Sequence, residues 1–358
     1  MELENSTYTL DELREILGCF SIPQYLFTYR PLTAGFINNT FLVSAQGNPL
    51  YVLQRINDSV FEDIHGLMHN VKKALGLLKA DDYVTLTLFQ TNKKVSFLKH
   101  KKGYWRLMNY IPNSTTFDTT ENPKIAFEAG KIIGRFHSLL QAENPKEFVD
   151  TIPQFHDLEL RKAQFQDALQ SAQKEKLKTA QEAITFAQGF FQELGKVDLK
   201  NLPLRVCHND TKLNNILFSK TSKEALCLID LDTIMSGYFF YDFGDAVRTI
   251  VNTAPEDEKD LGKITFDQNL FTSFVKGIVL HKPFLSEEEL SSLSLGPIFM
   301  SFIHGLRALT DYLNHNKYYK VSYENQNLDR ALSLFCFAKK ASEQKEFMTR
   351  QILENLNT

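Results

Sequence analysis

Cysteine is scarce in this sequence, and the positions of the cysteines argue against both a disulfide scaffold and a cysteine-based zinc site. Only 4 of the 358 residues are cysteines, and no two of them form a Cys-x-x-Cys pair. Scattered cysteines of this kind indicate neither a disulfide-stapled scaffold nor a zinc site built on thiolates. The four are Cys19, Cys207, Cys227 and Cys336.

Long apolar runs and a basic N-terminal leader are missing as well. Residues 1–5 lack the basic stretch of a signal peptide, and no apolar core follows them. The longest apolar passage, residues 293–306, is shorter than a membrane span and contains His304. We therefore expect a cytoplasmic protein that has no membrane partner.

Neither sign of charge is in large excess. The chain has 40 lysines and arginines against 43 aspartates and glutamates, so its formal net charge is −3. No strongly basic field would attract a phosphate backbone, and nucleic acid is not an expected partner. The apolar share of 43% is enough for a sizeable core, and the length predicts two domains or two lobes.

The pattern of the sequence changes near residue 110. Before that point, short runs of β-branched and aromatic residues alternate with turn residues, which is typical of β-strands. Thr9 and Glu12 have the spacing of a capping box and predict a short helix within residues 1–20. Strands are expected over 33–43, 51–55, 84–88, 95–98 and 104–108, and one amphipathic helix over 61–78.

The rest of the chain is expected to be mostly helical. A clear amphipathic helix covers 124–140, and residues 158–195 are interpreted as a long surface helix or a helix pair. A β-hairpin region interrupts at 204–231, and helices resume at about 265. The sequence therefore predicts an α+β fold with a small β-rich lobe over 1–109 and a larger helical lobe over 110–358.

The densest group of uncommon residues lies in a polar loop between two apolar strands, over 204–218. It contains the pattern His-x-Asp-x-x-x-x-Asn from His208 to Asn215, and a second apolar strand follows that ends at Asp230. Two short strands joined by a turn would bring Asp210, Asn215 and Asp230 to face one point. This set suits phosphoryl transfer, because the reaction needs an acid to orient the acceptor hydroxyl and oxygen ligands for magnesium.

Each residue of the set has an expected role in that chemistry. Asp210 would hold and finally deprotonate the acceptor hydroxyl. Asn215 and Asp230 would bind Mg²⁺, a hard cation that prefers oxygen ligands. Lys212, two residues past Asp210, could reach the transferring phosphate as a point charge.

Two other interpretations of this region account for fewer of its residues. His208 and Asp210 also match the metal pair of a hydrolase or an oxygenase, but such a site usually needs another histidine, and none has a partner spacing. A purely structural alternative is that these polar residues only cap a tight turn. We expect His208 to support the loop by hydrogen bonding, and Asp242 and Asp245 to cap the next helix and hold the loop.

Two pairs of segments carry a resemblance to a known family. Residues 208–215 together with 229–233 resemble the aminoglycoside phosphotransferase superfamily of small-molecule kinases, and 231–248 together with 305–313 are similar to its N-acetylhexosamine 1-kinase branch. The likeness runs from about Phe27 to Tyr319. It implies a bilobal protein-kinase-like fold, ATP and Mg²⁺ as cofactors, and phosphate transfer to the anomeric C1 hydroxyl of N-acetylglucosamine or N-acetylgalactosamine.

The resemblance also implies binding residues. In the acceptor site these are Asp210, Arg307 and Tyr318. In the N-terminal, nucleotide-binding lobe, residues 33–41 stand in place of the glycine-rich loop although they hold only Gly35. The expected nucleotide contacts are backbone N–H groups around Asn38, Asn39 and Thr40, then Gln54 or its neighbour Arg55 in place of the usual strand lysine, and a hinge of Met108, Asn109 and Tyr110.

Two alternatives stay open from the sequence. A kinase of the same fold could act on another acceptor, namely another sugar, choline, an aminoglycoside or homoserine. Choline would need an aromatic cage and an aminoglycoside a broad acidic surface. The missing strand lysine, with only Glu62 as a candidate for its helix carboxylate, would suit a pseudokinase that binds a ligand without catalysis.

Overall fold

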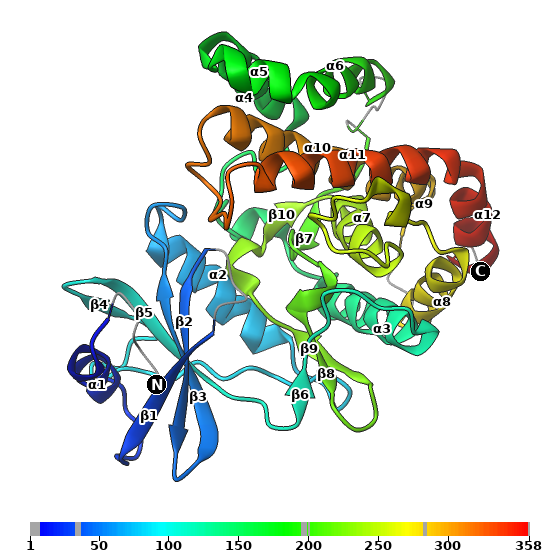
Figure 1. Ribbon diagram of the computed structural model, residues 1–358. Coiled ribbons are helices and arrows are strands. Elements are labelled where there is room, and N and C mark those ends of the chain that lie inside the picture. The colour runs from blue at the N-terminus through cyan, green and yellow to red at the C-terminus, as the bar shows by residue number, and fades with distance from the viewer. Residues whose placement is uncertain (1–7, 33–36, 195–198, 200, 282–284, 357–358) are drawn as a thin grey trace.

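The computed structural model describes residues 8–32, 37–194, 199, 201–281 and 285–356. Figure 1 shows a small lobe built on a twisted β-sheet and a larger lobe that is mostly helical. This architecture confirms the predicted α+β fold of two lobes. No helix in the described part of the chain is both long and apolar enough to cross a membrane.

Five antiparallel strands, in the order β1-β2-β3-β5-β4, form the sheet of the small lobe. Side chains alternate between its two faces, and the face that carries Phe41, Leu53 and Trp105 packs against helix α1. The predicted capping box of Thr9 and Glu12 is confirmed at the start of that helix. The elements are α1 (Leu10–Gly18), β1 (Phe27–Leu32), β2 (Asn39–Ala45), β3 (Asn48–Ile56), α2 (Ile64–Leu77), β4 (Leu98–His100) and β5 (Gly103–Asn109).

One predicted strand of this lobe is wrong and another is displaced. The segment 84–88 runs beside β5, but only Leu88 forms an isolated bridge with Met108, and the segment's first N–H group donates to a carbonyl of the large lobe. Its backbone groups are thus divided between two neighbours, and no ladder forms. The strand predicted over 95–98 is displaced to Leu98–His100.

The large lobe contains a small sheet, a two-stranded ribbon and a packed set of helices. The close contact between its helices α3 and α8 depends on glycine, because a Cβ on Gly130 would collide with the backbone of Phe274. The predicted hairpin over 204–231 is confirmed by β8 and β9. The elements are β6 (Ser114–Thr115), α3 (Pro123–Leu140), β7 (Arg205–Cys207), β8 (Ile216–Ser219), β9 (Ala225–Leu228), β10 (Met235–Gly237), α7 (Phe239–Ile250), α8 (Gln268–Val279), α9 (Glu287–Ser292), α10 (Gly296–Leu313), α11 (Gln326–Glu343) and α12 (Lys345–Leu356).

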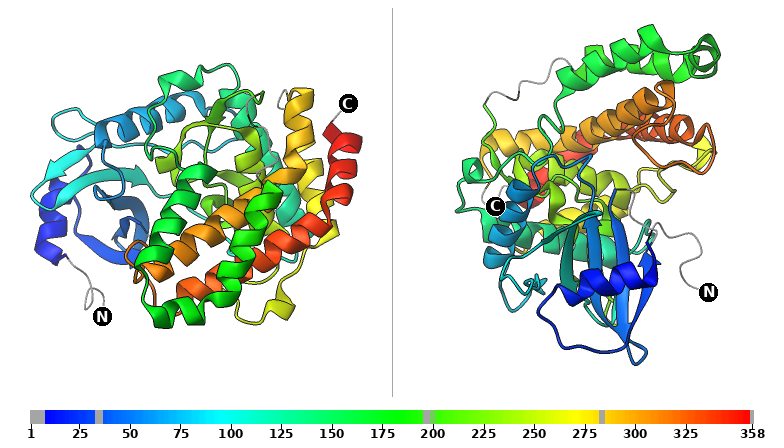
Figure 2. Two further views of the ribbon diagram at one scale, coloured as in Figure 1. Left: turned by 90° about the horizontal axis from the view of Figure 1, so that it is seen from above. Right: turned by 90° about the vertical axis from the view of Figure 1, so that its left-hand side faces the viewer.

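The region 158–195 forms three helices where one or two were expected. They are α4 (Leu158–Ser171), α5 (Lys174–Thr179) and α6 (Gln181–Leu194). The first break comes at Ala172, whose backbone is extended, and no glycine or proline marks it in the sequence. Figure 2 shows this group lying over α10 and α11, on the side away from the small-lobe sheet.

Candidate active site

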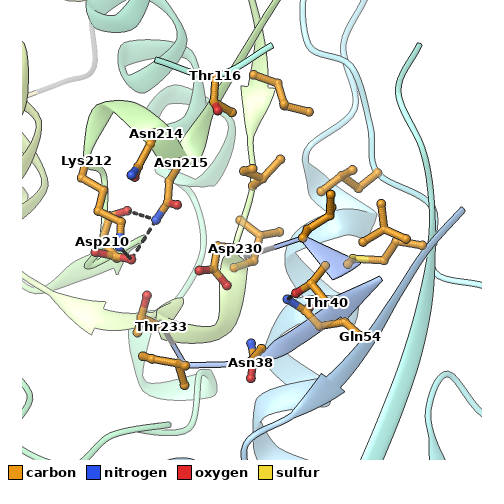
Figure 3. Close-up of a pocket in the computed structure, with 18 of the residues that line it drawn as sticks. Asn38, Thr40, Gln54, Thr116, Asp210, Lys212, Asn214, Asn215, Asp230 and Thr233 are labelled. Atoms are coloured by element: carbon orange, nitrogen blue, oxygen red, sulfur yellow. Dashed lines mark hydrogen bonds and ion pairs between the residues drawn. The ribbon is translucent and has the colours of Figure 1, made fainter. Parts of the chain in front are cut away.

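A cavity of about 480 Å³ lies between the two lobes. Strands β2, β3 and β5 supply one wall, and the loop after β7, strand β8, the end of β9 and helix α10 supply the other. Figure 3 shows side chains from both walls pointing into it. Most of the predicted site residues line it together: Asn38, Thr40, Gln54, Met108, Asn109, Tyr110, Asp210, Lys212, Asn215, Asp230, Arg307 and Tyr318.

Asn39 lies between two lining residues but does not line the cavity itself. It sits in strand β2, where Asn39 pairs with Arg55 and Thr40 pairs with Gln54. Because successive side chains of a strand point to opposite faces, Thr40 faces the cavity and Asn39 faces away. Gly35 and the other residues over 33–36 lie outside the described part of the chain.

Two polar side chains after β7, Lys212 and Asn215, contact the carboxylate of Asp210. Asn215 donates hydrogen bonds to Oδ2 of Asp210 over 2.7 Å and to its carbonyl oxygen over 2.8 Å. The ammonium of Lys212 lies 2.9 Å from the same Oδ2. Asp230, at the end of β9, faces them across the cavity (Figure 3). The convergence predicted from the His-x-Asp-x-x-x-x-Asn spacing is therefore present.

The charges of these groups are set by burial and by one another. Burial by itself would raise the pKa of Asp210, but the Lys212 ammonium outweighs it, and the net pKa lies below its ordinary value. Burial and the carboxylates of Asp232 and Asp210 raise the pKa of Asp230 to about 6. A carboxylate so disfavoured would be stabilised by a divalent cation, and the carbonyl oxygen of the Asn215 amide is a second suitable ligand.

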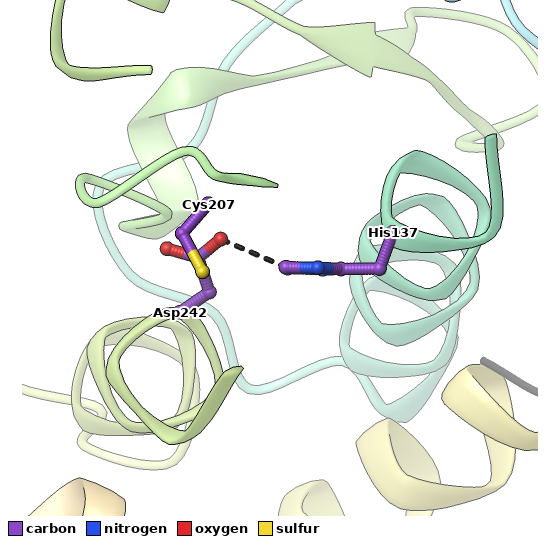
Figure 4. Close-up of side chains that lie close together, drawn as sticks. All are labelled: His137, Cys207 and Asp242. Carbon is purple, nitrogen blue, oxygen red and sulfur yellow. Dashed lines mark hydrogen bonds and ion pairs between the residues drawn. The ribbon is translucent and has the colours of Figure 1, made fainter. Parts of the chain in front are cut away.

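A buried aspartate, Asp242, holds the loop that follows β7. Asp242 accepts hydrogen bonds from the backbone N–H groups of His208, over 2.8 Å, and Asn209, over 2.7 Å. The ring of His137, on α3, lies 2.9 Å from the same carboxylate (Figure 4). The prediction that Asp242 holds the loop is confirmed. The prediction that it caps the helix is wrong, because α7 already begins at Phe239.

The predicted supporting role of His208 is also confirmed. Its Nε2 lies 2.9 Å from the carbonyl oxygen of Ile229, and its Nδ1 accepts a hydrogen bond from the backbone N–H of Asp210 over 3.3 Å. Both ring nitrogens are used, so His208 is not arranged as a metal ligand. Elsewhere in the described chain, His137, Cys207 and Asp242 place ligand atoms within 4.8 Å of one another (Figure 4), but the Asp242 oxygens are already engaged by the loop.

The far end of the cavity is rich in arginine. The guanidinium of Arg307, on α10, lies 4.8 Å from the ring centroid of Phe155 and 3.5 Å from the hydroxyl of Tyr318. Among the described residues, no carboxylate forms an ion pair with Arg307. Arg248 and Arg330 also line this end, and both pair with Glu256.

The small-lobe wall contains a cation that sequence reasoning missed. Arg106, in β5, is 2% exposed and lines the cavity. The two residues considered from the sequence behave differently from each other: Gln54 lines the cavity, whereas Arg55 faces away and pairs with Asp58 over 2.7 Å. Glu62 is exposed and does not line the cavity. Side chains of β5 alternate between the two faces of the sheet, so the sequence limits Arg106 to one face. Which face that is could be known only from the register of β5 against β3.

The segment predicted to be the hinge, residues 108–110, is anchored within the small lobe. The N–H of Asn109 donates to the carbonyl of Thr87 over 3.2 Å, and the N–H of Tyr110 donates to that of Leu50 over 2.9 Å. The side chain of Asn109 accepts from the N–H of Thr87 over 2.7 Å. Both hinge N–H groups are thus used inside the protein, and the cavity beside them is flanked by apolar side chains such as Leu217.

Comparison with known proteins agrees with this architecture. Residues 28–266, two thirds of the chain, match the family model described as the phosphotransferase enzyme family. This stretch includes the small-lobe sheet, Asp210, Asn215 and Asp230, and it ends before Arg307.

Several solved structures share the fold at low sequence identity. One is a microcompartment-associated aminopropanol kinase, with 18% identity, a TM-score of 0.62, and coverage of 94% of this chain and 98% of that one. Another is a choline/ethanolamine kinase family protein from Mesorhizobium loti, with 17% identity, a TM-score of 0.58, and coverage of 97% and 99%. A third is the amicoumacin kinase hAmiN in complex with AMP-PNP, Ca²⁺ and amicoumacin, with 15% identity, a TM-score of 0.58, and coverage of 94% of each chain. These matches establish the bilobal kinase-like fold.

Proposed function

Because the chain belongs to the phosphotransferase enzyme family, we propose that it is an ATP-dependent kinase that phosphorylates the C1 hydroxyl of an N-acetylhexosamine. In this proposal, residues 1–109 bind the nucleotide, and residues 110–358 supply the catalytic loop and the acceptor site. The solved relative that binds AMP-PNP and Ca²⁺ supports the use of a nucleotide with a divalent cation. A cytoplasmic location, with no membrane or nucleic-acid partner, is part of the same proposal.

The loop residues divide the work of phosphoryl transfer. Asp210 orients the acceptor hydroxyl and takes its proton, and the low pKa of this carboxylate keeps it ionised. Lys212 stabilises the charge of the transferring group. Asn215 and Asp230 would hold Mg²⁺, which when bound neutralises charge on the phosphates. The convergence of Asp210, Asn215 and Asp230 also favours an active enzyme over a pseudokinase.

The position of Arg307 over the aromatic rings of the acceptor site is the observation that favours a neutral acceptor. Two of the solved relatives are kinases of amines by name, aminopropanol and choline or ethanolamine. In this chain the ring faces that could cage an ammonium group are occupied, because the Arg307 guanidinium lies over Phe155 and within 5.7 Å of the Tyr318 ring centroid. A cationic acceptor would be repelled there, whereas an arginine fork and a phenol suit ring hydroxyls and an acetamido carbonyl.

An acceptor screen tests this function. ADP release would be measured with N-acetylglucosamine, N-acetylgalactosamine, glucose, choline, aminopropanol, homoserine and an aminoglycoside, and the phosphate position of any product would be assigned by phosphorus NMR. We expect turnover with an N-acetylhexosamine and coupling of the phosphorus to the anomeric proton. Turnover with an amine alone, or phosphate on another hydroxyl, would contradict the proposal, and absence of Mg-ATP binding by calorimetry would indicate the pseudokinase.

A further inference from the structure

Three neighbouring strands of the small lobe present a hydrogen-bonded row to the cavity. Thr40 of β2, Gln54 of β3 and Arg106 of β5 lie opposite one another in the sheet register, so their side chains share a face. Nε2 of Gln54 donates to the hydroxyl of Thr40 over 3.0 Å. Its Oε1 accepts from Nε of Arg106 over 2.9 Å and from Nη2 over 2.5 Å. Gln54 therefore orients the guanidinium.

The other end of the guanidinium reaches the large lobe. Nη1 of Arg106 forms an ion pair with Oδ1 of Asp232, and both side chains are buried. Oδ2 of Asp232 accepts a hydrogen bond from Nδ2 of Asn38 over 2.7 Å. Since Asp232 follows Asp230 by two residues, the ion pair fixes Arg106 beside the carboxylate that faces the cavity.

Arg106 also differs in charge from the other small-lobe residues that line the cavity. Among the described residues of the small lobe that line the cavity, it is the only cation. If Asp230 holds the metal of a bound nucleotide, the phosphates of that nucleotide lie next to Arg106. A guanidinium offers donors that match phosphate oxygens.

From this placement, and resting on the proposed function, we propose that Arg106 binds the terminal phosphates of the nucleotide and supplies the cation that is missing from β3. Gln54 and Asp232 act as positioning residues for it. Of the donors on the guanidinium, three are used by Gln54 and Asp232, and the remaining two N–H bonds are available to phosphate oxygens. The role is assigned to β5, whereas the sequence placed it on the strand that contains Gln54 and Arg55.

Calorimetry on the full-length protein tests this role without any acceptor. Binding of Mg-ATP, Mg-ADP and AMP would be measured for wild type, R106M and R106K, with R55M as the matched control on the other face of the sheet. We expect R106M to weaken Mg-ATP and Mg-ADP about tenfold or more and to leave AMP within about twofold, because the lost bonds are to terminal phosphates. R106K should recover part of the loss, and R55M should bind all three as wild type does.

A purely structural role for Arg106 makes different predictions. If it only neutralises Asp232, the double variant R106M/D232N would restore Mg-ATP affinity, and R106M alone would weaken AMP as much as ATP; either result would overturn the proposal. Persistent weak binding of Mg-ATP by the double variant, with AMP retained, would support it. If wild type binds Mg-ATP but phosphorylates no N-acetylhexosamine, the proposed acceptor fails while the role of Arg106 stands. If wild type binds no nucleotide, both fail.

Discussion

The carboxylate of Asp242 accepts a hydrogen bond of 2.8 Å from the backbone N–H of His208, two residues before Asp210. The same carboxylate holds the N–H of Asn209, whose φ of 61° is in the left-handed region that few non-glycine residues adopt. A buried acceptor therefore stabilises an unfavourable backbone conformation just where the chain must turn Asp210 into the cavity.

Replacing Asp242 by asparagine should loosen this loop. The amide has one acceptor oxygen for three donors, from His208, Asn209 and His137, so at least one donor is left poorly paired. We expect the D242N variant to lose about 1–3 kcal/mol of unfolding free energy and about tenfold or more in kcat. Urea denaturation and steady-state kinetics measure both effects, with D260N on an exposed loop as the control. A stability loss with unchanged kcat would show that the loop keeps its shape without Asp242.

Substitution of Asp210 by asparagine separates its chemical role from its structural one. The amide has nearly the same shape but cannot take the proton of the acceptor hydroxyl. We expect kcat to fall by about 10²–10⁴-fold. The variant should still fold and bind Mg-ATP, because the amide oxygen can accept the hydrogen bond from Asn215, and the thermal midpoint should fall only by the loss of the ion pair with Lys212. Near-wild-type turnover would rule out Asp210 as the group that accepts the proton.

His156 should make the stability of the protein sensitive to acid. Burial, followed by the nearby Arg307 guanidinium, lowers the pKa of this imidazole from 6.5 to about 4, and its Nε2 lies 3.1 Å from the carbonyl oxygen of Asn209. The unfolded chain therefore binds a proton that the folded chain excludes, and the neutral ring's contribution to stability is lost as pH falls from about 6.5 toward 4.

The H156Q variant tests this linkage, because glutamine can still donate to Asn209 and does not titrate. We expect His156 to account for about 2 kcal/mol of the stability that wild type loses between about pH 7 and pH 5. Urea denaturation at both pH values measures the difference. Equal pH dependence in wild type and H156Q would mean that the ring is protonated in the folded protein.

The sequence was sufficient for the features that depend on local spacing. The helix cap at Thr9, the helix over 124–140 and the meeting of Asp210, Asn215 and Asp230 follow from residues that are near one another in the chain or joined by a tight hairpin. The breaks between α4, α5 and α6 could not be predicted, because an extended alanine and not a glycine or proline causes the first of them.

Contacts between residues on strands that are far apart in the chain could not be predicted from local spacing. Arg106 reaches the cavity only because β5 pairs with β3 in a register that places it opposite Gln54, and a shift of one residue would turn it to the other face. Its partner Asp232 lies 126 residues further along the chain, and no local pattern relates the two. Local spacing therefore points to Gln54 or Arg55, on the neighbouring strand β3, and not to Arg106.

Arg307 should determine both affinity for a neutral acceptor and rejection of amines. Removing its guanidinium in R307M takes away hydrogen bonds to the acceptor and frees the faces of Phe155 and Tyr318. We expect kcat/KM for the N-acetylhexosamine to fall about 10- to 100-fold with the KM for ATP unchanged, and discrimination against choline to weaken. R350M, which alters an arginine on α12 beside Phe347, is the matched control. If R307M raised the KM for ATP as much as that for the sugar, Arg307 would be acting on the fold of the cavity and not on the acceptor.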